Sequence, residues 1–114
     1  MDSMELILLY DYYGALLTDR QKECFEMRYH QDLSLGEIGE ELGISRQGVH
    51  DNLSRTESML RNMEQKTGCM RRDLAYRKAT RLITESAKKL VANEDKDVSA
   101  LGSRILSAIE GLGE

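Results

Sequence analysis

A short segment near the middle of the chain, residues 45–55, carries side chains that could hydrogen-bond to nucleic-acid bases. Arg46 and Gln47 stand together at its head, and arginine suits guanine while glutamine suits adenine. If a helix begins after Ser45, its outer side presents the candidate DNA-binding residues Ser45, Arg46, Gln47, His50, Ser54 and Arg55. The alternative is a set of solvated polar residues in the first turns of a surface helix.

The residues around this segment predict the helix-turn-helix that would present it. Ser34 and Glu37 form a capping box for a first helix. Gly43 stands where the chain must turn sharply, and glycine tolerates the positive φ that such a turn requires. The inward-facing positions recur at helical spacing: Leu35, Ile38, Leu42, Val49 and Leu53. In DNA-binding proteins of this class, the outer face of the second helix enters the major groove.

Two residues of the presented helix have more than one interpretation. His50 could touch a phosphate or a base, or could be an exposed polar residue. Asp51 opposes phosphate binding, and it could accept from cytosine, act as a cap or pair with Arg55. We expect the pairing with Arg55, which lies one helical turn away.

The rest of the chain predicts further helices and no strands. We expect helices over residues 4–17, 18–29, 71–91 and 99–112, with Thr18 and Gln21 as a second capping box and Ser99 as the last cap. The chain lacks proline and tryptophan. The prediction is one all-α domain over residues 1–114, with a helix-turn-helix module at 18–66 and a C-terminal helical extension at 69–114.

The net charge of −4 argues against strong non-specific nucleic-acid binding. Residues 17–64 carry six basic and ten acidic side chains, whereas residues 65–92 carry eight basic and two acidic ones. The basic stretch contains candidate contacts for a phosphate or a partner: Arg71, Arg72, Arg77, Lys78 and Arg81. The alternatives are a solvated helix face or an intramolecular partner for the acidic residues. The apolar sides of the two C-terminal helices could close the core of one chain, but we expect them to support a homodimer.

Other features indicate no catalytic chemistry. Tyr10, Tyr12 and Tyr13 could form a stacking platform for a single strand, but packing in the core is the stronger interpretation. Cys24 is expected to be a small core residue. The sequence predicts no metal site, no cofactor, no enzyme activity and no membrane span. No signal peptide is visible at the N-terminus, so we expect a cytoplasmic protein.

Two families resemble parts of this sequence. Residues 17–60 resemble region four of bacterial sigma factors, a helix-turn-helix module of the winged-helix-type superfamily that reads promoter DNA. The YlxM-type family of small bacterial proteins is the closer resemblance. Its pattern Tyr-Asp-Tyr-Tyr-Gly-x-Leu-Leu-Thr stands at residues 10–18, and Ile-Ser-Arg-Gln-x-Val-x-Asp-Asn stands at residues 44–52.

The YlxM resemblance implies a helix-turn-helix regulator linked to protein targeting by the signal recognition particle. The family's recognition positions correspond to Ser45, Arg46, Gln47, His50 and Ser54. Acidic Asp51 departs from the usual sigma-like pattern, which argues against tight DNA binding and leaves room for a protein partner. One hypothesis is therefore a regulator that binds double-stranded DNA. The other is an interaction protein that contacts the GTPase or the RNA of the signal recognition particle. A third, weaker hypothesis is a competitor for RNA polymerase.

Overall fold

The computed structural model describes residues 3–112, which form six α-helices and one 3-10 helix. They follow the chain in the order α1 (Ser3–Tyr13), η1 (Gly14–Leu16), α2 (Asp19–Tyr29), α3 (Leu35–Leu42), α4 (Arg46–Thr67), α5 (Cys69–Val91) and α6 (Lys96–Glu110). The prediction of an all-α fold is confirmed. The chain divides into two compact units, Met1–Met70 and Arg71–Glu114, and the outermost two residues at each terminus lie outside the described part.

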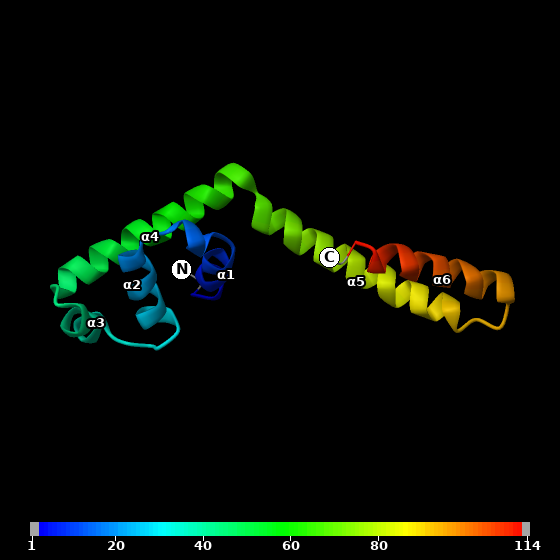
Figure 1. The fold of residues 1–114 in the computed structure, drawn as a ribbon, viewed down its shortest axis with the longest axis horizontal. Helices are drawn as coiled ribbons and strands as arrows, with labels where there is room; N and C mark the ends of the chain where they lie inside the picture. The colour runs from blue at the N-terminus through cyan, green and yellow to red at the C-terminus, as the bar shows by residue number, and fades with distance from the viewer. Residues whose placement is uncertain (1–2, 113–114) are drawn as a thin grey trace. The chain divides into compact units, whose positions relative to one another are not determined.

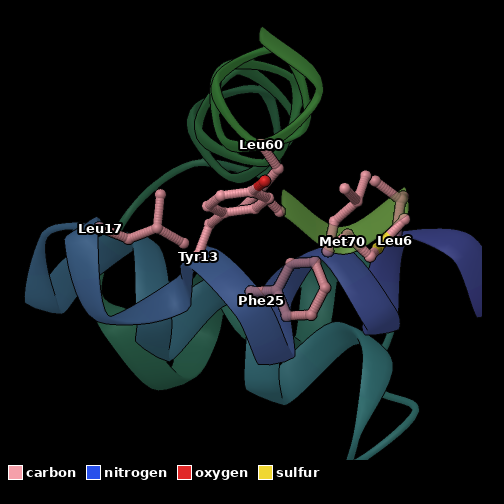
Figure 2. Packing of buried hydrophobic residues seen from close by; sticks show 7 residues of the cluster. Leu6, Tyr13, Leu17, Phe25, Leu60 and Met70 are labelled. Carbon is pink, nitrogen blue, oxygen red and sulfur yellow. The ribbon is translucent and has the colours of Figure 1, made fainter. Parts of the chain in front are cut away.

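In the first unit, α1, α2 and α3 pack along the long helix α4 (Figure 1). The main core lies where α1, α2 and α4 meet, and Figure 2 shows Tyr13 and Phe25 among its aliphatic side chains, with Leu60 reaching in from α4. Tyr10 stacks on Phe25 with ring centroids 4.3 Å apart. This packing supports the interpretation of Tyr10 and Tyr13 as structural residues.

The first helix is shorter than predicted. The sequence predicts a helix to Leu17, but α1 ends at Tyr13 and the chain tightens into η1 before Leu17 turns to an extended conformation. Gly14 is buried at the point where α1 ends and η1 begins, and a Cβ at this position would lie 3.1 Å from the Tyr10 ring. The ring therefore occupies the space that a side chain at position 14 would need. The capping box of Thr18 and Gln21 at the start of α2 is confirmed.

A hydrogen-bonded cluster ties the end of α4 to α1 and to the start of α5. Glu64 Oε1 accepts from the Tyr13 hydroxyl at 2.6 Å and from the backbone N–H of Met70 at 3.0 Å. The Thr67 hydroxyl lies 2.6 Å from that of Tyr13 and accepts from the Cys69 N–H. Gly68 ends α4 with φ +63°. The first N–H groups of α5 are thus satisfied by side chains of the preceding turn.

In the second unit, α5 and α6 form an antiparallel hairpin (Figure 1). The helices touch at Gly102, where a Cβ would lie 2.7 Å from the backbone nitrogen of Val91. The predicted cap of the last helix is wrong. Asp95 caps α6 by accepting from the N–H groups of Asp97 and Val98, whereas Ser99 lies inside α6 and donates to the Val91 carbonyl. Within residues 3–112, no helix has the length and apolar character needed to cross a membrane.

Candidate nucleic-acid interface

Helices α3 and α4 form a helix-turn-helix whose two N-termini are capped as the sequence predicts. Ser34 accepts from the Glu37 N–H, and Glu37 accepts from the Ser34 N–H in return. Ser45 accepts from the Gly48 N–H at 3.0 Å and begins α4. Gly43 ends α3 with φ +70°, a conformation that costs glycine little.

The close approach of α3 to the start of α4 depends on Gly39. A Cβ at this position would lie 2.7 Å from the Ile44 carbonyl oxygen and 3.5 Å from the Ser45 carbonyl carbon. The 3.5 Å separation is an ordinary contact, but the Ile44 oxygen at 2.7 Å is a backbone atom of the turn itself and cannot move aside without shifting the head of α4. Gly39 therefore fixes the position of the residues that α4 presents.

A second, smaller hydrophobic core packs α2 against the two helices of the motif. Cys24 of α2, Ile38 of α3 and Val49 of α4 are fully buried against one another, so the prediction of Cys24 as a core residue is confirmed. Burial also raises the pKa of the Cys24 thiol, which favours an inert side chain over a nucleophile. The Arg20 guanidinium donates to the Leu42 carbonyl at 3.4 Å and joins α2 to the end of α3.

The structure exposes the predicted DNA-binding residues on the outer side of α4. They are Ser45, Arg46, Gln47, His50, Ser54 and Arg55. A shallow depression of about 450 Å³ opens between the two helices and is lined by Leu35, Arg46, Gln47 and His50. Arg46 forms no hydrogen bond or ion pair with any other described residue, so its guanidinium is available to a ligand.

Asp51 does not have the partner that the sequence predicts. Its Oδ1 accepts from Gln47 Nε2 at 2.9 Å and lies 3.6 Å from His50 Nδ1. Within residues 3–112, no ion pair joins Asp51 to Arg55. The amide of Gln47 reaches the carboxylate from one turn away because residues four apart share a helix face. Sequence reasoning missed this contact, although the spacing of Gln47 and Asp51 permits it.

Acidic side chains dominate the first helix of the motif. Glu37, Glu40 and Glu41 line a depression of about 320 Å³ together with Leu33. Hydrogen bonds from the Ser34 backbone N–H and hydroxyl hold the pKa of Glu37 below its ordinary value, so this carboxylate is charged at neutral pH. Phosphate contacts near α3 are therefore disfavoured, and the cations of the motif, Arg46 and Arg55, both lie on α4.

The basic residues predicted as phosphate or partner contacts lie on α5, in the second unit. Arg71, Arg72, Arg77, Lys78 and Arg81 are all exposed. Arg77 pairs with Asp73 at 3.1 Å across one helical turn. The surface consists of side chains from one helix, so it can act independently of the helix-turn-helix.

Comparison with known proteins supports the motif that the geometry defines. A sequence model of the family UPF0122, described as "Putative helix-turn-helix protein, YlxM / p13 like", matches residues 1–99. The chain belongs to the UPF0122 family. The resemblance to YlxM-type proteins is thus confirmed.

Three relatives from this family match the chain over different lengths and with different sequence identities. A UPF0122 protein from Thermoanaerobacter sp. (strain X514) is 59% identical over 71 residues, which is 62% of this chain. Another, from Acetivibrio thermocellus, is 40% identical over 106 residues, or 93% of this chain and 88% of its own. A third, from Bacillus cereus (strain AH187), is 38% identical over 104 residues, or 91% of this chain and 90% of its own. The chain spans 61% of the Thermoanaerobacter relative.

Proposed function

We propose that this UPF0122 protein is a non-enzymatic regulator that binds double-stranded DNA through the outer side of α4. The observation that supports this most directly is the placement of Arg46. It is exposed in the first turn of the second motif helix, where helix-turn-helix proteins contact base edges. It has no competing hydrogen bond or ion pair among the described residues.

Each residue of this surface has a distinct expected role. Arg46 reads a guanine through a bidentate contact, and the side-chain carbonyl of Gln47 remains available while its amide donates to Asp51. Ser45 and Ser54 contribute hydroxyl groups, and Arg55 contacts a phosphate on the far side of the groove. Asp51 lowers affinity for any duplex, so binding depends on base contacts more than on charge. We infer that the DNA-binding form is a homodimer.

A selection experiment tests this proposal. The full chain would be used to select from a pool of duplexes with a randomised centre, and the affinity of the selected duplex would then be measured. We expect an Arg46→Ala/Gln47→Ala variant to bind about 10- to 100-fold more weakly, since a bidentate base contact contributes about 1–3 kcal/mol. Lys66→Ala removes one exposed cation near the other end of α4 and should change binding little. If no sequence is enriched, the proposal fails.

A second candidate function is an interaction with the signal recognition particle, which the resemblance to YlxM-type proteins implies. The acidic surface of α3 and the exposed cations of α5 favour it, since a cationic helix suits an RNA backbone. Charge reversal by Arg77→Glu/Arg81→Glu should then abolish capture of the particle's RNA or GTPase, while Arg46→Ala leaves it unchanged. If the wild type captures neither the RNA nor the GTPase, the DNA-binding proposal is favoured.

A further inference from the structure

The hairpin of α5 and α6 leaves one broad apolar face uncovered. On α5, Ala79, Leu82, Ser86 and Leu90 follow one another at steps of three and four residues, which places them on one side of the helix. On α6, Leu101, Ile105 and Ala108 do the same, and Leu112 follows two residues after the end of the helix. The two rows meet at a depression of about 480 Å³ lined by side chains of both helices: Leu90, Leu101, Arg104, Ile105 and Ala108.

The hairpin buries too little of its own surface to be stable as an isolated pair. Among residues 71–112, the buried ones are Ala87 and Gly102, both small and both at the crossing of the helices. The large apolar side chains remain open to solvent, with Leu82 65% exposed and Leu101 53% exposed. An isolated pair of helices depends on burying its amphipathic faces, so this face requires a cover that is present whenever the protein is folded.

The size of the face matches one side of a dimer interface. The exposed fractions of Leu82, Ile83, Leu90, Leu101 and Leu112 range from 36% to 65%. With roughly 180 Å² for a fully exposed leucine, they leave on the order of 450 Å² of apolar surface, as large as the main apolar patch of a soluble monomer. One side of a standard interface buries about 800 Å², and about two-thirds of it is apolar in homodimers.

Charge also permits two copies to meet through this face. The cations Arg77, Arg81 and Lys88 of α5 recur at steps of four and seven residues, and this spacing places them on a different side from Leu82 and Leu90. Arg104 is the single cation lining the depression between the helices. Lys78 and Lys89 lie four and seven residues from Leu82 and therefore border its side of α5. Two hairpins can pack their apolar faces together while Arg77, Arg81 and Lys88 stay in solvent.

From these observations we propose that the apolar face of the α5–α6 hairpin binds the same face of a second copy of this chain. Two hairpins so joined form a four-helix bundle, in which each helix buries its apolar side against the others. The two-fold symmetry makes the contact isologous, so Leu82 of one protomer lies against the apolar face of its partner. The surface lies wholly within the second unit, and the inference does not depend on DNA binding.

Sedimentation equilibrium of the full chain tests this proposal without DNA. We expect a dimer at micromolar concentrations, and at least a 100-fold weaker self-association for the variant Leu82→Glu/Leu101→Glu with its helical circular dichroism retained. Leu16→Glu is the matched control, because Leu16 is 69% exposed in the first unit, and it should remain dimeric. A chain that is monomeric at about 100 µM overturns the proposal, as does a folded double variant that stays dimeric.

Cross-linking provides a test that does not disturb the face. In a Cys69→Ser background, Ser86→Cys places a thiol within the apolar row of α5, and Ser103→Cys places one on α6 next to Gly102, away from the row. A short bis-maleimide should join two Ser86→Cys chains and join Ser103→Cys chains at least ten times less efficiently. Equal cross-linking at both positions, or none at position 86, would overturn the proposal.

Discussion

At the scale of single residues, the contact between Gln47 and Asp51 determines which polar groups on the outer side of α4 are available to a ligand. The exposed carboxylate of Asp51 accepts from the Gln47 amide, a group that could otherwise donate to a base in the proposed DNA complex. Arg46, one residue earlier, has no such partner among the described residues. If α4 binds DNA as proposed, Arg46 is available for a base contact, whereas the Gln47 amide must first leave Asp51.

Replacement of Asp51 by asparagine tests whether the negative charge at this position weakens DNA binding. Asp51→Asn keeps an oxygen that accepts from Gln47 and removes one negative charge, so we expect the selected duplex to bind about 3- to 10-fold more tightly at low salt. Fluorescence anisotropy with a labelled duplex measures the change. Glu23→Gln makes the same charge change on an exposed residue of α2 and should have a smaller effect. Weaker binding by Asp51→Asn would mean that the carboxylate itself contacts the DNA.

Tyr10 is a residue whose ionisation affects stability. Burial, followed by the hydrogen bond to Glu26, raises its pKa to about 12. The unfolded chain loses this proton near pH 10, so the stabilisation by the neutral hydroxyl is fully present below pH 10 and is lost as the pH rises towards 12. Urea denaturation of the wild type and Tyr10→Phe at several pH values should show the wild type losing more stability over this range. Parallel curves would contradict the assignment.

At the scale of elements, two glycines of α3 have opposite roles. Gly39 lies against the backbone of the turn, and a Cβ at this position would be 2.7 Å from the Ile44 carbonyl oxygen. A Cβ at Gly36 would have the Ser34 hydroxyl oxygen, 4.0 Å away, as its nearest neighbour. Glycine inside a helix costs about 0.5–1 kcal/mol relative to alanine. That cost is the same at both positions, so the surroundings decide the effect of a substitution.

We expect Gly39→Ala to lower the free energy of unfolding by about 1–3 kcal/mol because the turn must shift to admit the methyl group. Gly36→Ala, one turn earlier, should raise it by about 0.5–1 kcal/mol. Thermal or urea denaturation followed by circular dichroism measures both. A stabilising Gly39→Ala would show that α3 can move away from α4 at little cost.

Local signals in the sequence predict the elements of the first unit well. The capping boxes at Thr18 and Ser34, the cap at Ser45 and the glycine at 43 are features of neighbouring residues, and all are confirmed. The errors arise where a particular side-chain contact decides the end or the start of a helix. The Tyr10 ring meets Gly14 where α1 ends, and Ser99 bonds to the Val91 carbonyl from inside α6 while Asp95 takes the cap. For the two C-terminal helices, the sequence shows their apolar sides, but whether those sides close one chain's core follows only from packing.

At the scale of the whole molecule, the helix-turn-helix is acidic and α5 is basic. The helix-turn-helix segment, residues 34–55, carries two arginines and four carboxylates, whereas α5 carries seven basic and two acidic side chains. A duplex that meets α4 alone gains few ionic contacts, while one that also meets α5 gains many. The salt dependence of binding therefore distinguishes the two modes.

Each phosphate that a cation neutralises contributes about −0.9 to the slope of log K against log salt. If Arg55 and one further cation of each protomer contact phosphates, a homodimer should give a slope of about −2 to −4, and Arg77→Glu/Arg81→Glu should leave it unchanged. Affinities of the selected duplex measured between about 50 and 300 mM salt supply the slope. A slope of about −7 or steeper that this variant reduces would assign α5 to the DNA interface as well.

We propose that α4 binds specific DNA in the cell, and the decisive experiment is crosslinked recovery of the tagged full chain from its own cells. DNA, RNA and protein would be quantified together for the wild type and for Arg46→Ala/Gln47→Ala. We predict discrete DNA fragments that are enriched with the wild type and lost with the variant. If no DNA is enriched, and the same RNA or protein is recovered with both, the claim is contradicted and the motif serves another interaction.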